Sequence, residues 1–325
     1  MNKPDISVVM TAYNEEQYIA DAIDSVLNQK FDDFELIIID DNSTDGTSEI
    51  VREYSQRCEK IKLIINKQNQ GQSISRNKAL NSSRGNYIAV MDADDISAEN
   101  RLKLQYEFLE NNPDVFLCGS SCIKITKDGE EIGETNVPSN PQRKLPEKNV
   151  IIHPSIMFRN NGQVEYRDKF EYSQDYDLHL RLISDGKKLV NIEKPLIKYR
   201  ITPNSVTQSN QVRQQYFAKK AKDFFKEREK GEEDSYNSFT PKDSLSAGMN
   251  NTIAERNYYE AVVISSLRSN NNQTAREYFR RYCDVSSNGK KKALLHLATS
   301  CPLCYRIYHN MKKISTQGVL RQLCE

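Results

Sequence analysis

The stretch Tyr87-Ile-Ala-Val-Met-Asp-Ala-Asp-Asp95 decides how this chain of 325 residues is interpreted. An apolar run, Tyr87 to Val90, leads directly into the carboxylates of Asp92, Asp94 and Asp95. Two carboxylates about 4 Å apart repel each other by roughly 4 kcal/mol at an effective dielectric of about 20. A buried strand that ends in several acids therefore predicts a site where positive charge is bound.

Short apolar runs alternate with amphipathic segments before this stretch. The runs at 6–10, 34–39, 61–65 and 87–90 read as strands, and the segments at 15–28, 44–57 and 73–81 read as helices. Continuously apolar strands that alternate with helices indicate a mostly parallel sheet covered on both faces. We therefore predict an α/β fold.

Polar loops follow three of the predicted strands. Their sequences are Thr11-Ala-Tyr-Asn-Glu15, Asp40-Asp-Asn-Ser-Thr-Asp45 and Asp92-Ala-Asp-Asp95. Ligands bind at the carboxyl ends of the strands in such sheets, so the three loops are expected on one rim. Asp45 and Ser97 suit helix capping. Capping does not account for five further acids on this rim, which are either solvated loop acids or, as we expect, ligands of a hard divalent cation, Mn²⁺ or Mg²⁺, that arrives with a diphosphate. They are Asp40, Asp41, Asp92, Asp94 and Asp95.

The common phosphate-binding loops are absent from the sequence. No GxxxxGK[ST] occurs, and no GxGxxG follows a strand. A metal and nearby cations must therefore bind the diphosphate. Arg76, within Gly71-Gln-Ser-Ile-Ser-Arg-Asn77, is a candidate, and the alternative is an arginine on a solvated helix surface.

The remaining chain divides near residue 208. Helices are expected at 101–111 and 173–184, and strands at 115–118, 123–125 and 156–158, with a strand pair over 188–199. After residue 208 only helical patterns occur, at 211–230, 251–269, 274–283 and 290–299. We predict one domain over 1–208, with halves 1–99 and 100–208, and an all-α extension over 209–325.

Several of these motifs together resemble the consecutive motifs of family-2 inverting glycosyltransferases of the GT-A fold, of the kind that builds bacterial surface glycans. The first four are Ser7-Val-Val-Met-Thr-Ala-Tyr-Asn-Glu15, Ile39-Asp-Asp-Asn-Ser-Thr-Asp-Gly-Thr47, the Gly71 to Asn77 segment and Met91-Asp-Ala-Asp-Asp95. The resemblance continues through His153-Pro-Ser-Ile-Met-Phe-Arg159, Ser173-Gln-Asp-Tyr-Asp-Leu178 and Tyr199-Arg200. It implies a catalytic domain whose halves bind the nucleotide sugar and the acceptor.

The resemblance also implies roles for individual residues. The nucleoside base is expected against the Thr11 to Asn14 loop and Asp41, the ribose near Asp92, the metal on Asp94 of the DxD motif, and the catalytic base at Asp175. The full set expected to bind the nucleotide sugar is Thr11, Ala12, Tyr13, Glu15, Asp41, Arg76, Asp92 and Ala93.

Two positions depart from the family pattern. Gln174 replaces the usual Glu before the catalytic Asp, and Ile201-Thr-Pro203 stands where the family often has a His. His153 is either a packed loop histidine or an acceptor contact. Asp177 and His179, on the same helix as Asp175, are expected to be structural.

The function that follows is transfer of a sugar from a nucleotide diphosphate sugar, expected to be a UDP-sugar, to a hydroxyl of a glycan or lipid-linked acceptor. A sugar-1-phosphate nucleotidyltransferase is the second possibility, although its usual Gly-rich loop is replaced here by Thr11 to Glu15. A nucleotide-sugar-binding protein without activity is the third, and the presence of Asp94 and Asp175 disfavours it.

Composition narrows the partners and the location. The net charge of +1 and the hydrophobic content of 37% do not suggest nucleic-acid binding or disorder. No signal peptide and no membrane-spanning run are evident, and the seven cysteines suggest reduced thiols in the cytoplasm. Basic and apolar residues interleave over 287–324, which predicts either a contact with the anionic inner face of the cell membrane or a helical cap with a solvated basic face.

Overall fold

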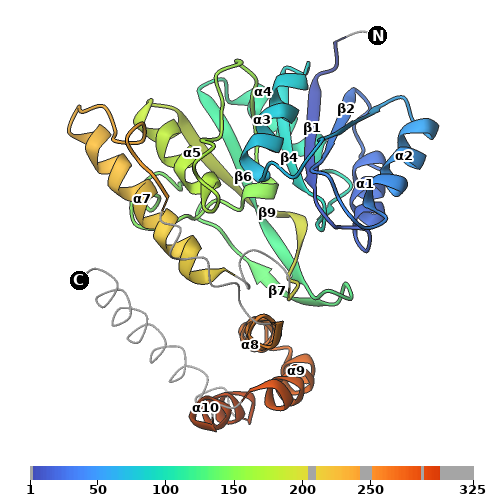
Figure 1. Ribbon diagram of the computed structural model, residues 1–325, viewed down its shortest axis with the longest axis vertical. Coiled ribbons are helices and arrows are strands. Elements are labelled where there is room, and N and C mark those ends of the chain that lie inside the picture. Colours follow the sequence, from blue (N-terminus) through green and yellow to red (C-terminus); the bar gives the residue numbers. More distant parts are fainter. Residues whose placement is uncertain (1–2, 204–209, 242–250, 287–288, 301–325) are drawn as a thin grey trace. The chain divides into compact units, whose positions relative to one another are not determined.

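The computed structural model describes residues 3–203, 210–241, 251–286 and 289–300 (Figure 1). The chain forms two compact units. Among the described residues, the first comprises 3–123, 135–200 and 212–241, and the second comprises 124–134, 201–203, 210–211, 251–286 and 289–300.

The first four strands of the sheet are parallel, as the sequence predicts. Strand β1 lies between β2 and β4, and β3 lies outside β2. All seven residues of β2 are buried, because helices cover both faces of the sheet. Three strands run one or two residues further than expected, so that they end in the polar residues of the rim. The four strands are β1 (Ile6–Ala12), β2 (Phe34–Asp40), β3 (Ile61–Ile65) and β4 (Tyr87–Asp92).

The sheet continues beyond β4 with antiparallel strands, so it is a mixed sheet. The order across it is β3-β2-β1-β4-β8-β6-β9-β5, and β7 pairs with β6. Strand β8 (Met157–Arg159) is antiparallel to both β4 and β6. The other strands are β5 (Ile96–Ser97), β6 (Val115–Ile125), β7 (Glu131–Thr135) and β9 (Lys188–Arg200).

Two long strands correct the sequence interpretation. The runs at 115–118 and 123–125 belong to the single strand β6, and the expected pair over 188–199 is the single strand β9. Gly119 lies within β6, between the two predicted runs. A Cβ at this position would lie 2.5 Å from Asn191 Oδ1 of β9, so only a glycine allows this close approach. Strands β5 and β7 were not predicted, because β5 has only two residues and β7 has one buried apolar residue, Ile132, among polar and small residues.

Two hydrophobic clusters cover the two faces of the sheet. One joins alternate strand residues such as Val8 and Met10 to α1, α2 and α4, and the other joins Val9 and Ile37 to α3, α5 and α7. The alternation follows from the two-residue period of a strand. The helices are α1 (Ile19–Leu27), α2 (Thr47–Arg57), α3 (Gln72–Ser82), α4 (Arg101–Asn111), α5 (Gln174–Ser184) and α7 (Gln211–Glu229), and His153–Ser155 forms a 3₁₀ turn, η1.

Helix α7 contributes aromatic side chains to the first unit. Phe217, Phe224 and Phe225 are buried in the same cluster as Phe170 of the 165–170 loop. This packing begins after the boundary that the sequence predicts near residue 208, and that boundary remains a prediction.

The second unit is mainly helical in its described part. Helix α8 (Asn251–Arg268) packs on α9 (Asn272–Val285), with Tyr258 and Tyr278 in buried edge-to-face contact. Helix α10 (Gly289–Ser300) follows. Among the described residues, no helix is both long enough and apolar enough to cross a membrane.

Candidate active site

The polar loops meet at the carboxyl ends of the parallel strands, as the sequence predicts. Thr11 of β1 is aligned with Ile39 of β2 on one side and with Asp92 of β4 on the other. Ala12 is buried at the end of β1, whereas Tyr13 is 45% exposed. The first loop therefore borders the acids of the DxD segment and presents one aromatic ring to solvent.

The first and second loops are held together by hydrogen bonds. Asn14 adopts a left-handed conformation with φ 56°, and its backbone amide donates to Ser43 Oγ at 3.0 Å. The amide of Thr44 donates in turn to Asn14 Oδ1 at 2.8 Å. The amide of Glu15 donates to Thr47 Oγ1 at 2.8 Å. The residues before both helices belong to these loops, so α1 starts at Ile19 and α2 at Thr47, later than the sequence predicts.

The two capping residues that the sequence suggests behave differently. The carboxylate of Asp45 accepts a hydrogen bond from the Thr47 amide at 3.1 Å and so binds a free backbone donor at the start of α2. The N-cap position itself is occupied by Gly46. Ser97 is not a cap. It lies in β5, where its amide donates to Ser25 Oγ at 3.0 Å and its hydroxyl accepts from Gln29.

The carboxylates of Asp40 and Asp41 accept hydrogen bonds from protein donors and need no metal. The sequence prediction that all five rim acids surround a cation is therefore corrected for these two. Asp40 is fully buried, and its carboxylate accepts from the backbone amide and the hydroxyl of Ser43. Asp41 accepts from Asn66 Nδ2 at 2.7 Å and from the amides of Gln70 and Gly71 at 2.9 and 2.8 Å. Asp41 thus holds the loop that starts α3.

The remaining acids, Glu15, Asp92, Asp94 and Asp95, form a cluster in which the charges of Asp92 and Asp94 oppose ionisation of neighbouring carboxylates. Burial, followed by Asp94 and Asp92, raises the pKa of Glu15 to about 8. Burial, followed by Asp92, raises the pKa of Asp94 to about 7. Asp95 is 1% exposed, and burial together with Asp94 and Asp92 raises its pKa well above 3.8.

Two buried arginines supply part of the missing positive charge. Arg76 Nη2 lies 2.8 Å from Asp92 Oδ1, and the arginine is 4% exposed, so it is not on a solvated helix face. Arg200 donates from Nε to the carbonyl of Asp94 at 2.8 Å and stacks over the ring of Tyr18 at 4.6 Å. Sequence reasoning assigned no role to Arg200. Its only signal was the Tyr199-Arg200 motif.

The composition of the cluster fits a divalent cation that is only partly bound by protein. The described residues contain no group of three metal-binding side chains already placed around one point. Asp92 is paired with Arg76, while burial and like charge keep the pKa values of Glu15 and Asp94 raised in spite of the charge of Arg200. Such a site suits Mn²⁺ or Mg²⁺, whose coordination is commonly completed by phosphate oxygens.

Asp175 lies in the first turn of α5. Ser173, directly before the helix, adopts φ 53°, and its hydroxyl donates to the carbonyl of Gln214 at 3.0 Å. Asp175 Oδ2 accepts from Asn149 Nδ2 at 2.8 Å. Burial raises the pKa of Asp175, and the charge of Arg76 opposes that rise. Gln174, which replaces the usual Glu, donates to Gln72 Oε1 of α3.

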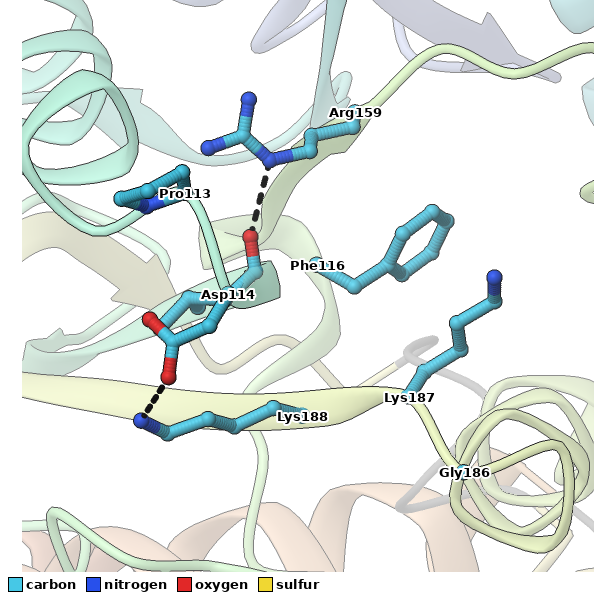
Figure 2. A pocket seen from close by; sticks show the side chains of 8 residues that line it. Pro113, Asp114, Phe116, Arg159, Gly186, Lys187 and Lys188 are labelled. Atoms are coloured by element: carbon cyan, nitrogen blue, oxygen red, sulfur yellow. Dashed lines mark hydrogen bonds and ion pairs between the residues drawn. The ribbon is translucent and has the colours of Figure 1, made fainter.

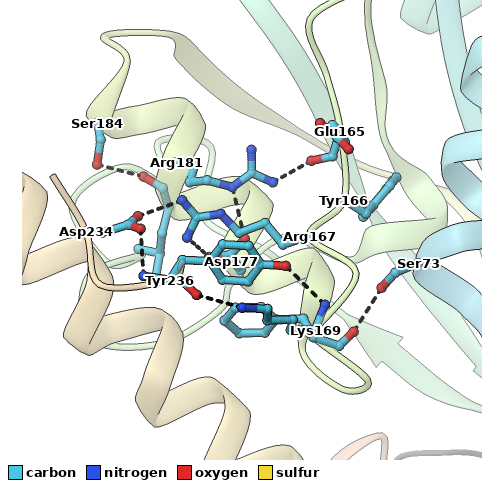
Figure 3. Close-up of polar contacts among 12 residues, drawn as sticks. Ser73, Glu165, Tyr166, Arg167, Lys169, Asp177, Arg181, Ser184, Asp234 and Tyr236 are labelled. Carbon is cyan, nitrogen blue, oxygen red and sulfur yellow. Dashed lines mark hydrogen bonds and ion pairs between the residues drawn. The ribbon is translucent and has the colours of Figure 1, made fainter. Parts of the chain in front are cut away.

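Asp177 has a structural environment, as expected. It is fully buried and accepts from Arg181 Nε at 2.9 Å and from Arg167 Nη1 at 3.5 Å (Figure 3). Arg167 continues to Asp234 at 2.7 Å. The carboxylate of Asp177 is therefore held by two arginines and is unsuited to accept a proton from a substrate.

The environment of His153 argues against the acceptor contact considered from the sequence. It lies in η1, is 6% exposed, and its Nε2 lies 2.9 Å from the hydroxyl of Tyr166. Burial, with Arg76 and His179, lowers its pKa well below 6.5. The ring is neutral and packed, which agrees with the first of the two alternatives.

A separate surface pocket lies at the opposite, amino end of the parallel strands (Figure 2). Its cations are already engaged, since Lys188 pairs with Asp114 at 2.6 Å and Arg159 donates to the carbonyl of Val115 at 2.9 Å. It contains none of the predicted site residues. Its lining consists of Pro113, Asp114, Val115, Phe116, Arg159, Gly186, Lys187 and Lys188.

Comparison with known proteins identifies the family. The family model "Glycosyl transferase family 2" matches residues 7–172. This chain belongs to glycosyltransferase family 2. An uncharacterized glycosyltransferase of Methanocaldococcus jannaschii is 38% identical over 223 residues, which cover 66% of this chain and 77% of that protein.

Two solved structures of low sequence identity share the fold. S. aureus TarS in complex with UDP-GlcNAc has a TM-score of 0.55 at 17% identity, covering 97% of this chain and 92% of that chain. The mannosyltransferase PcManGT from Pyrobaculum calidifontis, in complex with GDP-Man and Mn²⁺, has a TM-score of 0.55 at 16% identity, covering 99% and 88%. The GT-A fold and the glycosyltransferase class predicted from the motifs are confirmed, and the nucleotidyltransferase alternative is not supported.

Proposed function

We propose that this glycosyltransferase moves a sugar from a nucleotide diphosphate sugar, expected to be a UDP-sugar, to a hydroxyl of a glycan or lipid-linked acceptor, with inversion at the anomeric carbon. The observation that carries the proposal is the position of Arg76. Its guanidinium pairs with Asp92 at 2.8 Å, and its charge opposes the raised pKa of Asp175. One buried cation thus acts on both the DxD segment and the proposed base.

The donor is proposed to bind at the rim of the first loops. Tyr13 offers an exposed ring beside Thr11 and Ala12, and an aromatic face suits a nucleoside base. The two solved structures contain different nucleotides, UDP-GlcNAc in TarS and GDP-Man in PcManGT. An assay that compares UDP-sugars with GDP-sugars therefore tests the expected UDP-sugar.

Asp94 is the proposed protein ligand of a divalent metal, with Glu15 and Asp92 close by. The raised pKa values of Glu15 and Asp94 and the complex of PcManGT with Mn²⁺ support this assignment. A bound Mn²⁺ or Mg²⁺ would stabilise the negative charge that develops on the leaving diphosphate.

Asp175 is the proposed general base. An alcohol is a weak nucleophile at neutral pH, so a positioned carboxylate must accept its proton during attack. The acceptor oxygen forms a bond to the anomeric carbon, its proton moves to Asp175, and the carbon–oxygen bond to the diphosphate breaks with its electron pair on the diphosphate. Attack from the face opposite the leaving group inverts the configuration. The raised pKa of Asp175 makes it a stronger base than an exposed aspartate.

The test is an assay of nucleoside diphosphate release with a panel of sugar nucleotides and Mn²⁺. We expect Asp175→Asn to keep donor binding by calorimetry while kcat falls at least about a hundredfold, because general-base contributions are typically about 10² to 10⁴. Asp94→Ala is expected to lose Mn²⁺-dependent activity and to weaken binding of the metal–nucleotide complex. Glu53→Gln, on the exposed side of α2, serves as the control.

Each alternative predicts a different outcome of this assay. Wild-type kcat in Asp175→Asn would place the base elsewhere, and near-normal turnover in a folded Asp94→Ala protein would remove the metal assignment. Binding of sugar nucleotides without turnover, in the presence of a range of acceptors, would contradict the proposed transfer.

A further inference from the structure

Two buried histidines pack against each other, and one of them, His179, lies on the same helix as Asp175. His153 is 6% exposed and His179 is fully buried, and their ring centroids are 5.5 Å apart. Neither ring belongs to the acid cluster at the rim. Burying polar rings costs free energy unless their nitrogens are hydrogen-bonded. The hydrogen bonds of the two rings therefore indicate which groups they position.

The pair lies within a row of polar side chains that ends at the carboxylate of Asp175. Tyr166 Oη is 2.9 Å from His153 Nε2 at one end. At the other end, His179 Nδ1 is 3.3 Å from Asn149 Oδ1, and Asn149 Nδ2 donates to Asp175 Oδ2 at 2.8 Å. The row therefore connects α5, η1 and the loop that contains Asn149.

The neighbours of Asn149 determine the orientation of its amide. Asp175, when ionised, can only accept, so the NH₂ group of Asn149 must face it. The backbone amide of Ile151 lies 3.2 Å from the other atom, which identifies that atom as the oxygen. His179 must then donate from Nδ1, and its Nε2 is left as an acceptor.

The tautomer of His153 is assigned from its contact with Tyr166. Burial raises the pKa of Tyr166 above its usual value, so the phenol keeps its proton and can donate to His153 Nε2. His153 Nδ1 then carries hydrogen. His153 Nδ1 and His179 Nε2 both lack a partner among the described residues, and in this assignment they are a donor and an acceptor.

We propose that Asn149 is a positioning residue for Asp175, held in place by His179 and His153 as neutral Nδ1–H tautomers. The amide occupies Asp175 Oδ2, so that Oδ1 accepts the proton of the acceptor hydroxyl. This inference rests on the proposed role of Asp175 as the base. The histidines act only through Asn149.

The effect on catalysis is measurable as a loss in kcat with little change in donor binding. Removing a supporting hydrogen bond to a functional group typically costs about 10- to 100-fold, as for residues that support metal ligands. We expect Asn149→Ala to lower kcat by about that factor and to leave the donor KM within about twofold. Asn160→Ala, which removes an amide bonded to the carbonyl of Gly85 at 2.8 Å, is the matched control and should retain wild-type kcat.

The pH profile separates positioning from a general loss of structure. Arg76, Tyr166 and Tyr176 interact electrostatically with Asp175, and His179 reaches it only through Asn149. The backbone amides of Asp175 and Tyr176 also stabilise its charge. The Asn149 amide is a further donor to the ionised form. Its removal in Asn149→Ala should shift the acid limb of the kcat profile to higher pH, which a purely structural loss of active protein would not do.

Long-range ¹H–¹⁵N NMR of the histidine rings tests the tautomers without any assay of activity. Both His153 and His179 are expected to be neutral Nδ1–H forms between pH 5 and 9, with assignments from His153→Phe and His179→Phe. In Asn149→Ala, His179 should change towards the Nε2–H form, because its acceptor is lost. An Nε2–H tautomer at His179 in the wild-type protein would overturn the proposal.

The kinetic outcomes distinguish this inference from the proposed function. An inactive Asp175→Asn together with a wild-type pH profile and kcat in Asn149→Ala would overturn the positioning role alone. Wild-type kcat in Asp175→Asn would overturn the base assignment, and the positioning role with it, whatever the NMR spectra show.

Discussion

At the scale of single residues, burial and mutual repulsion dominate the site. Glu15, Asp92, Asp94 and Asp95 lie on one rim, where Asp92 pairs with Arg76 and the side chain of Arg200 bonds the backbone carbonyl of Asp94. Burial is the first cause of the raised pKa of Glu15, of Asp94 and of Asp95. The protein therefore accepts a local electrostatic cost where a cation and a diphosphate are proposed to bind.

This cost predicts how metal binding depends on pH. The unfolded chain releases the protons of Asp94 and Glu15 near 3.8 and 4.5, whereas the folded chain holds them to about 7 and about 8. Between these values the folded state binds more protons, so the contribution of both groups to the unfolding free energy falls as pH rises. We expect Mn²⁺ to raise the melting temperature more at pH 8 than at pH 5.5, because a cation favours the ionised carboxylates.

The measurement is a thermal melt of the wild-type protein and Asp94→Asn with and without Mn²⁺. Comparison with the variant removes the opposite trend from His179, whose lowered pKa makes stability rise with pH. Metal-free Asp94→Asn should exceed the wild type in stability at pH 8, with a smaller difference at pH 5.5. Equal Mn²⁺ shifts in both proteins would show that the ion binds elsewhere.

At the scale of elements, the helix that carries Asp175 is anchored by a buried ionic network (Figure 3). Arg167 contacts Asp177 of α5 at 3.5 Å and Asp234 at 2.7 Å, and its guanidinium stacks over Tyr236 at 4.4 Å. Arg228 of α7 also pairs with Asp234. The network joins α5, the 165–170 loop and the segment after α7, so it fixes the helix that carries the proposed base through contacts that do not involve Asn149.

Loss of Arg167 should destabilise this part of the protein. Asp177 is fully buried and would keep only Arg181, and breaking a buried pair typically costs about 3 to 5 kcal/mol. The side chain of Arg167 is 19% exposed, so we expect about 2 to 3 kcal/mol for Arg167→Ala, measured by urea denaturation. The control is Arg57→Ala, whose partner Glu53 is exposed, and it should cause no resolvable change. A similar result for both variants would mean that the network does not anchor α5.

At the scale of the whole molecule, the C-terminal region is proposed to bring the enzyme to a membrane-bound acceptor. The basic residues over 287–324 belong mostly to positions outside the described residues. In α10, Lys291 pairs with Glu260 at 2.5 Å and Lys292 donates to the carbonyl of Cys283 at 2.5 Å, so these two cations are used within the second unit. Membrane contact would therefore depend on the cations further along the chain.

Replacement of Lys312, Lys313 and Arg321 by Gln in the full chain tests this proposal. We expect the wild-type protein to co-sediment with anionic vesicles at low salt and to be released at high salt, because the attraction to anionic lipid is screened. The triple variant should remain in solution, whereas Lys219→Gln on α7 should behave as the wild type. Equal binding of the triple variant and the wild type would contradict a membrane role for these residues.

The amino-acid sequence by itself determined the architecture of the nucleotide-binding half. The apolar runs that form β1 to β4 are short and continuous, so burial on both faces and parallel pairing follow from local composition alone. The order of the motifs identified the family, and the family model matches residues 7–172. These features could be predicted because each depends on neighbouring residues in the chain.

Only the tertiary structure decided which acids are free for chemistry. Asp41 and Asp94 read alike as loop acids, yet Asp41 is saturated by Asn66, Gln70 and Gly71. Asp175 and Asp177 are two residues apart, and what separates them is a contact with Asn149 in one case and with Arg167 and Arg181 in the other. Such partners come from distant segments, and their positions depend on how whole elements pack. Local periodicity carries no information about that packing, and the ionisation of each acid follows from it.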